Sequence, residues 1–260
     1  MVFSLMNSLM LALASPLAHQ GVAVHHFDLG ARVLSPIGNG VPLRIMPLGA
    51  SITWGMLSTD GNGYRNDLRT QLTAAGNLVN MVGNVHHGTM KDNDNEGWPG
   101  YRIDQVHAKA TGSVPKWKPN VILLNAGTND AGQNRNISAA GDRMEQLLTD
   151  LYSMSPRACI VLSTLLVNKK ALTEANVLLI NSQFRAVADK LRRAGRRLIL
   201  VDMHGDDGPQ ILDMADDTHP NDEGYRKMAN IWYAGLVQAS NAGCLQRAET
   251  VPDVPDNGGS

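Results

Sequence analysis

The chain has 260 residues, which is long enough for one large domain with a substantial core. Its 23 basic and 24 acidic side chains nearly balance, which argues against proteins that bind nucleic acid or anionic membranes through charge. Glycine is plentiful (25 residues) and aromatic residues make up only 5%, a composition that favours an α/β fold with many tight turns. We therefore expect neither a nucleic-acid partner nor a membrane partner.

The first 14 residues are apolar and end in Ala12-Leu13-Ala14, a small-residue pattern typical of signal-peptide cleavage sites. The basic segment that usually precedes such a stretch is missing, and a buried N-terminal helix is the alternative interpretation. We expect residues 1–18 to form a secretory signal peptide, so that the protein is secreted and extracellular. No later stretch is long and apolar enough to span a bilayer.

Strand-like apolar runs alternate with helical patterns from residue 43 onward. Strands are expected at 43–48, 79–83, 120–125, 159–164 and 198–202, and helices at 64–75, 103–110, 137–155, 172–194 and 222–239. This alternation predicts a parallel sheet covered by helices on both faces, with its ligand site beyond the carboxyl ends of the strands. We expect a single domain over residues 19–245 and a disordered tail over residues 246–260.

Four short polar motifs interrupt this pattern. Ser51 lies in Gly-Ala-Ser-Ile-Thr (49–53), at a sharp turn directly after the first predicted strand. Gly-Trp-Pro-Gly (97–100), Gly-Thr-Asn-Asp (127–130) and Asp-Asp-Thr-His-Pro (216–220) follow. A serine, an Asp-x-x-His pair and a positioned asparagine supply a nucleophile, a base with its orienting carboxylate, and an oxyanion donor. The motifs together point to a serine esterase.

His219 is the best candidate for the base, because Asp216 three residues earlier can hold its imidazole in the correct tautomer. Asp217 competes with Asp216 for the orienting role. His204, which follows the last predicted strand, competes as the base, although we interpret it as a residue of the site's rim. Asn221 is expected to cap the helix that begins after the fourth motif.

These motifs, in this order, resemble the four sequence blocks of the SGNH (GDSL-type) hydrolases, and the resemblance spans roughly residues 43–236. The second block, Glu-Gly-Trp-Pro-Gly-Tyr-Arg-Ile (96–103), is most similar to the acetyl xylan esterases of carbohydrate esterase family 3. The resemblance implies a three-layer α/β/α sandwich with a flavodoxin-like, five-stranded parallel sheet. The family's D-x-x-H spacing also favours Asp216 over Asp217. One departure is Ala50, which stands where the family's Gly-Asp-Ser has an aspartate outside the triad, so we expect the chemistry to survive.

The resemblance also implies three oxyanion donors: the backbone N–H groups of Ser51 and Gly100 and the side-chain amide of Asn129. Gly97 or Gly83 could replace Gly100 in this role. Asp130 is expected to be a structural hydrogen-bond partner. The reaction of such an esterase needs no cofactor and no metal.

Trp54, Trp98 and Tyr101 lie beside these motifs, where their faces could stack on sugar rings or could equally pack into the core. The substrate that the resemblance implies is a carbohydrate ester such as acetylated xylan, deacylated through an acyl-enzyme by a monomeric protein. A lipid or small-ester acylhydrolase with the same triad is the alternative within the class. A non-catalytic carbohydrate-binding relative is the alternative from another class.

Two further patterns are ambiguous. Asp-Asn-Asp-Asn-Glu-Gly (92–97) resembles the first half of a calcium loop, but its twelfth position is Ile103 rather than glutamate, which favours a solvated loop. Cys159 is expected in a core strand and Cys244 beyond the last helix, so two separate thiols are favoured over a disulfide.

Overall fold

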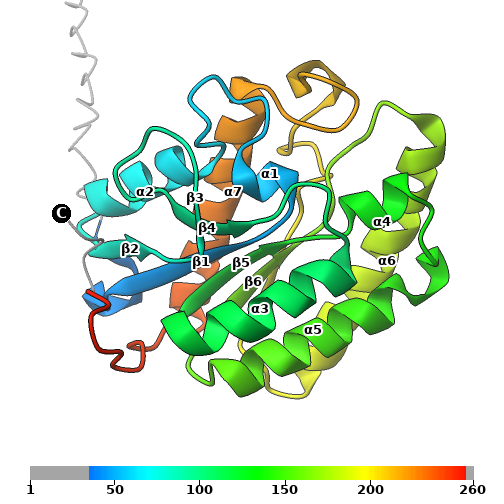
Figure 1. Cartoon of the computed structure of the whole chain (residues 1–260). Helices are drawn as coiled ribbons and strands as arrows, with labels where there is room; N and C mark the ends of the chain where they lie inside the picture. The colour runs from blue at the N-terminus through cyan, green and yellow to red at the C-terminus, as the bar shows by residue number, and fades with distance from the viewer. Residues whose placement is uncertain (1–34, 256–260) are drawn as a thin grey trace, which may run out of the picture. The chain divides into compact units, whose positions relative to one another are not determined.

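The computed structural model describes residues 35–255, all of which belong to one compact unit. A central sheet is packed between helices on both faces (Figure 1). The expected signal peptide at 1–18 and the last five residues of the expected tail lie outside the described residues. Between residues 35 and 255, no helix combines the length and the apolar character that crossing a membrane requires.

The five predicted strands are present and run parallel. They are β1 (Leu43–Gly49), β2 (Val79–Met81), β5 (Val121–Asn125), β6 (Cys159–Ser163) and β7 (Leu198–Val201). Their order in the sheet is β2-β1-β5-β6-β7. This is the flavodoxin-like strand order, and it confirms the predicted fold class.

Two short strands extend the sheet beyond the prediction. β4 (Asp94–Gly97) pairs in parallel with the end of β1, through Leu48 and Gly49, while β2 pairs with the start of β1. β3 (Val85–His86) adds to β4 in the antiparallel direction. The expectation of a solvated loop at 92–97 is therefore wrong. The polar side chains of Asn95 and Glu96 are fully buried there because their hydrogen bonds are made within the protein.

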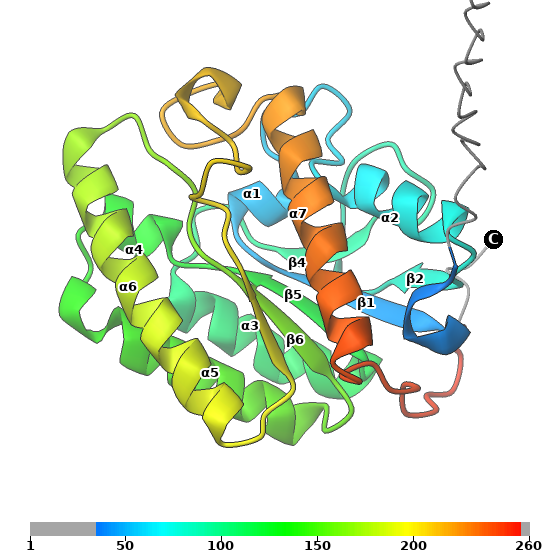
Figure 2. The ribbon, with the colours of Figure 1, turned by 180° about the vertical axis from the view of Figure 1, so that it is seen from behind.

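Alternate residues of β1, β5, β6 and β7 enter two different cores, as the pleat of a strand requires. In β5, Ile122 and Leu124 pack with α3 (Ile103–Trp117), α5 (Ala140–Met154) and α6 (Ala171–Arg193). Val121 and Leu123 instead pack with α2 (Arg65–Ala74) and α7 (Asp222–Asn241) on the other face. Figure 2 shows α7 lying across that second face. The sandwich thus has three layers.

The helices differ from the prediction mainly at their ends. α3 continues seven residues past its predicted end at 110, through Gly112 and Pro115, because Val114 is buried in the core and this packing outweighs the helical hydrogen bond that Pro115 removes. Short helices not predicted as separate elements are α1 (Ser51–Trp54), α4 (Thr128–Gly132), η1 (Ile37–Gly40), η2 (Ile137–Ala139) and η3 (Ile211–Asp213).

After α7 the chain crosses the amino ends of the central strands as a segment that we call the C-terminal strap (residues 245–255, red in Figure 1). The Asn120 side chain donates a hydrogen bond to the Gln246 carbonyl (2.6 Å), and the Arg44 guanidinium donates to the Glu249 carbonyl (2.9 Å). The described part of the chain thus holds tertiary contacts beyond the expected limit at 245. The limits at 18/19 and 245/246 themselves stay predictions.

Candidate active site

Ser51 stands at the carboxyl end of β1, as the first residue of α1. The turn into α1 is tight because Gly49 passes close to the neighbouring strand. A Cβ at Gly49 would lie 2.1 Å from the Asn125 carbonyl oxygen and 2.3 Å from Thr53 Oγ1, so only glycine fits. Ala50, where the family has aspartate, is the N-cap of α1, and its carbonyl accepts the hydrogen bond of the Trp54 N–H (3.0 Å).

His219 reaches Ser51 from the loop that precedes α7. Its Nε2 lies 2.8 Å from Ser51 Oγ, and its Nδ1 lies 2.8 Å from Asp216 Oδ2. A carboxylate can only accept hydrogen bonds, so the ring proton belongs on Nδ1, and Nε2 accepts from the Ser51 hydroxyl. The structure therefore brings Ser51, His219 and Asp216 together in one relay, as the sequence pattern predicts.

Asp216 is held by more than the imidazole. Its Oδ1 also accepts from the backbone N–H groups of His219 (2.6 Å) and Thr218 (2.7 Å). Partial burial acts to raise the pKa of Asp216, but these hydrogen bonds outweigh it and lower the pKa below its usual range. Asp216 therefore remains an ionised carboxylate at neutral pH and can accept the hydrogen bond from His219.

The two competing residues lie elsewhere. Asp217 pairs with Lys170 (3.5 Å) and His204 Nε2 with Glu174 (2.7 Å), so neither takes the place of Asp216 or His219. The predicted cap is confirmed, because the Asn221 side chain accepts from the Gly224 N–H (3.0 Å) at the start of α7.

The loop that carries Asp216 and His219 is anchored to the segment after β6. The Lys169 ammonium donates to the Met214 carbonyl (3.0 Å), and the buried Asn168 amide donates to Thr218 Oγ1 (3.0 Å). Sequence reasoning did not find these two residues, since nothing in the chain around 168–169 indicates which loop they face.

Gly100 and Asn129 follow the two strands on either side of β1, the strand that ends before Ser51. β1 lies between β4 and β5, and Gly100 and Asn129 follow these two neighbouring strands at their carboxyl ends. The Asn129 amide donates to the Tyr101 carbonyl (2.9 Å), which ties the second and third motifs together. Gly100 has a φ of +82°, a left-handed conformation that favours glycine.

The alternative donors Gly97 and Gly83 have packing roles instead. The Gly97 N–H donates to Asn95 Oδ1 (2.8 Å), and a Cβ at Gly97 would lie 2.4 Å from the Trp54 nitrogen. A Cβ at Gly83 would lie 2.1 Å from the Asn95 carbonyl oxygen. Both glycines therefore allow β4 to approach its neighbours closely.

Asp130 is fully buried and joins three elements, as expected for a structural partner. One carboxylate oxygen accepts from the Ile103 N–H (2.9 Å) at the start of α3, and the other accepts from Arg143 of α5 (3.0 Å). Burial raises the pKa of Asp130 despite these bonds.

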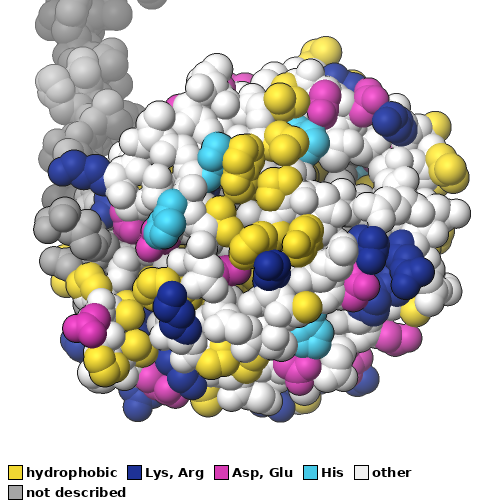
Figure 3. Space-filling view, viewed as in Figure 1, with side chains coloured by type: hydrophobic (Ala, Val, Ile, Leu, Met, Phe, Trp, Pro, Cys, Tyr) yellow, Lys and Arg dark blue, Asp and Glu magenta, His cyan; other side chains and the backbone are white. Residues whose placement is uncertain are grey.

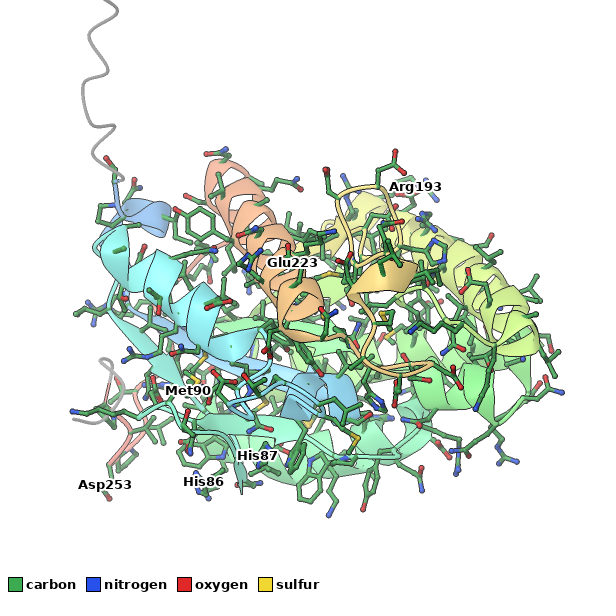
Figure 4. The ribbon with its side chains drawn as sticks, turned by 90° about the horizontal axis from the view of Figure 1, so that it is seen from above. His86, His87, Met90, Arg193, Glu223 and Asp253 are labelled. Carbon is green, nitrogen blue, oxygen red and sulfur yellow. The ribbon has the colours of Figure 1, made fainter. Side chains whose placement is uncertain are left out.

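The aromatic residues beside the motifs form two stacked pairs, and Trp54, Trp98 and Tyr101 are each partly exposed. Trp54 stacks on His87, with ring centroids 3.2 Å apart at 11°, and Trp98 stacks on Tyr101 at 5.8 Å. Figure 3, which has the same viewpoint as Figure 1, shows hydrophobic side chains gathered in the upper half of the molecule's visible face, with histidine beside them. His86 and His87 lie next to each other at the β3 edge (Figure 4).

Two charged side chains hold the Trp98 ring in place. Its indole N–H donates to the buried Glu96 carboxylate (2.8 Å), and the Lys109 ammonium lies 3.9 Å from its ring centroid. Burial raises the pKa of Glu96, while the bond from Trp98 lowers it to a lesser extent. These contacts hold the Trp98 ring at one orientation near the second motif.

Arg65, which sequence reasoning missed, binds the backbone that carries the Trp54 and His87 rings. The side chain is fully buried and donates to the carbonyls of Trp54 (3.1 Å), His87 (2.8 Å), Gly61 (3.0 Å) and Asn93 (3.0 Å). It therefore links the end of α1 with the backbone beneath both rings of the Trp54–His87 stack. Burial lowers the pKa of Arg65, although an arginine remains charged.

The residues of the half calcium-loop pattern are bonded to protein groups. Asp92 accepts from Arg69 (2.8 Å) and from the Met81 N–H (3.0 Å), and Asp94 pairs with His86. Within residues 35–255, no group of three or more histidine, cysteine, aspartate or glutamate side chains is arranged to hold a metal ion.

Known proteins share both this sequence pattern and this fold. The sequence profile of the GDSL-like Lipase/Acylhydrolase family matches residues 48–227, which include Ser51 and His219. A multidomain esterase from Ruminococcus flavefaciens is 30% identical over 248 residues, covering 83% of this chain and 31% of the relative. The chain thus spans about a third of the length of that curated relative.

Solved structures are similar over most of the chain. A family 3 carbohydrate esterase from Clostridium thermocellum matches with a TM-score of 0.67 and 26% identity, covering 77% of this chain and 98% of that one. A family 3 carbohydrate esterase from Talaromyces cellulolyticus matches with a TM-score of 0.67 at 21% identity, covering 77% and 99%, which shows a shared fold. The chain belongs to the GDSL-like Lipase/Acylhydrolase family, because the family profile matches well over half of its residues.

Proposed function

We propose that Ser51 is the nucleophile of this esterase, His219 its general base and Asp216 the carboxylate that orients the imidazole. The observation that carries the proposal is the continuous relay of 2.8 Å from Ser51 Oγ to His219 and 2.8 Å from His219 to Asp216. As Oγ attacks the ester carbonyl, His219 takes its proton and then gives it to the leaving alcohol. Water, activated by the same imidazole, hydrolyses the acyl-enzyme.

The oxyanion of the tetrahedral intermediate is proposed to lie between the donors that flank Ser51. These are the backbone N–H groups of Ser51 and Gly100 and the side chain of Asn129. A primary amide has two N–H groups, so the bond from Asn129 to the Tyr101 carbonyl orients the amide and leaves one N–H for the substrate. Each such donor lowers the barrier by about 3–4 kcal/mol.

The substrate is proposed to be an acetylated carbohydrate such as acetylated xylan. Two findings support this choice: the similarity to the Clostridium thermocellum family 3 carbohydrate esterase, and the partly exposed aromatic rings beside Ser51's motif and the second motif. Trp54, Trp98 and Tyr101 are the proposed sugar contacts, since aromatic faces pack well on the apolar faces of sugars. Such a polymer substrate fits the proposal that the protein is secreted and acts outside the cell as a monomer.

The proposal is tested by measuring acetate release from acetylated xylan beside hydrolysis of p-nitrophenyl acetate and a long-chain p-nitrophenyl ester. Release of acetate from acetylated xylan and hydrolysis of the short ester, but not of the long one, is the expected result. Preference for the long chain would move the substrate to lipids while leaving the triad intact. No turnover of any ester by the folded protein would overturn the catalytic assignment and revive a binding role.

A further inference from the structure

The two cysteines of the chain, separated by 85 positions in sequence, are neighbours in the structure. Cys159 is the first residue of β6, and Cys244 lies just past the end of α7. With Ala239 they form one buried cluster, and the two thiols are close enough to influence each other's ionisation. Two residues from different elements of the fold thus bring their thiols close together.

The backbone on both sides of this contact is fixed by its own hydrogen bonds. The Cys159 N–H donates to the Asn120 carbonyl (2.8 Å), and Cys159 pairs with Val121 of β5 in the sheet. The Cys244 N–H donates to the Ala239 carbonyl (2.8 Å) at the end of α7. The approach of the two thiols therefore follows from the sheet register and from the helix end, and not from a mobile loop.

The contact also makes the two thiols chemically different. The interaction between the two thiols raises the pKa of Cys159 and lowers that of Cys244. Burial of Cys159 adds to the rise. Cys244 is consequently the better nucleophile of the pair toward a disulfide-containing oxidant.

We propose that Cys159 and Cys244 are a disulfide-forming pair that covalently joins β6 to the residue directly before the C-terminal strap. The Cys244 thiolate attacks a sulfur of a small-molecule or protein disulfide and releases one thiol. The Cys159 thiolate, having lost its proton to solvent, then attacks the Cys244 sulfur of the mixed disulfide and releases the second thiol. The two cysteines together lose two protons and two electrons, and the oxidant's disulfide is reduced to two thiols.

The bond has a structural consequence at the amino edge of the sheet. Cys244 directly precedes the C-terminal strap, whose carbonyls accept hydrogen bonds from Asn120 and Arg44. Cross-linking it to β6 reduces the conformational freedom of the unfolded chain and holds the strap's origin in place. Ser51 lies at the opposite, carboxyl edge of the sheet, so the esterase activity does not depend on the bond.

The test equilibrates the purified full-length protein, without denaturant, in a buffer of oxidised and reduced glutathione. The sample is then acid-quenched, unfolded and alkylated with iodoacetamide. We expect intact mass spectrometry to find no alkylated cysteine before reduction and both alkylated after it. Two alkylated cysteines without reduction, or glutathione attached to one cysteine alone, would overturn the proposal.

A second measurement uses the same chain as its own control. Reductant should lower the Tm of the oxidised protein by about 5–15 °C. It should leave the Tm of Cys244→Ser and of the double variant Cys159→Ala/Cys244→Ala unchanged, and p-nitrophenyl acetate hydrolysis should stay constant throughout. An equal response of the variants to reductant would show that the cysteines are not joined.

Discussion

The two edges of the central sheet are built from the same strands but differ in what their side chains do. At the carboxyl edge, Ser51 and Asn129 follow β1 and β5, and Ser51 is hydrogen-bonded to His219 in the proposed catalytic relay. At the amino edge, Arg44 and Asn120 lie at the beginning of the same two strands. The Asn120 side chain accepts a hydrogen bond from the Arg44 N–H, and both side chains donate to carbonyls of the C-terminal strap. We therefore assign catalysis to the carboxyl edge and stabilising contacts to the amino edge.

This contrast predicts which variants change activity and which change stability. Substitutions at the carboxyl edge should reduce turnover while leaving Tm nearly unchanged. Substitutions at the amino edge should reduce Tm while leaving turnover unchanged. The four variants below are ordered from the largest expected effect on activity to the smallest.

Ser51→Ala should abolish ester hydrolysis, because no other group can form the acyl-enzyme. The loss should exceed about 1000-fold in kcat, and thermal unfolding should match the parent protein. Steady-state kinetics with p-nitrophenyl acetate measure the effect, and the exposed Ser153→Ala on α5 is the control. A residual rate above a thousandth of the parent's would contradict the role of Ser51.

Asn129→Ala should lower kcat by about 100- to 1000-fold with little change in KM, since an oxyanion donor acts mainly in the transition state. Asn129→Asp keeps the shape but replaces the two N–H donors by an acceptor, so it should lose at least as much. A rise in KM alone would make Asn129 a substrate-binding residue instead.

Arg65→Lys should reduce kcat/KM by about 10- to 100-fold. Lysine keeps the charge but cannot bond all four carbonyls through which Arg65 fixes the backbone of Trp54 and His87. The matched control is Arg69→Lys, one turn along α2, whose partner Asp92 is not part of the site. Equal kinetics of the two variants would show that Arg65 contributes to stability alone.

Asn120→Ala should leave kcat and KM unchanged and lower Tm by several degrees. The buried Asn120 side chain accepts from the Arg44 N–H (2.7 Å) and donates to the carbonyls of Pro42 (2.8 Å) and Gln246 (2.6 Å). Leaving such groups without partners costs about 1–3 kcal/mol. Differential scanning calorimetry measures the change, with the exposed Asn241→Ala as control. A loss of activity at unchanged Tm would refute the division between the edges.

The carboxyl edge was more predictable from sequence than the amino edge. Asp216 and His219 are three residues apart, and Ser51 directly follows an apolar strand, so local spacing carried both signals. The alternation of strands and helices also predicted a parallel sheet with helices on both faces, whereas the flavodoxin-like arrangement was implied by the family resemblance. These features depend on residues close together in the chain, which sequence patterns report directly.

The remaining features depend on contacts between residues far apart in the chain. β4 has the polar sequence Asp-Asn-Glu-Gly, and it is a buried strand only because the fold supplies hydrogen-bond partners to Asn95 and Glu96. Arg65 lies in an ordinary helical pattern, and its carbonyl partners come from the end of α1 and from two separate loops. Neither the strap nor the contact between Cys159 and Cys244 has a local signal.

The most direct test of the catalytic assignment is covalent labelling with a fluorophosphonate, a reagent that needs an activated serine. We expect one label per protein molecule, located by peptide mass spectrometry at Ser51, and a strongly slowed reaction in His219→Ala. Labelling at another residue, or labelling of Ser51 at the same rate without the His219 imidazole, would contradict the proposed relay.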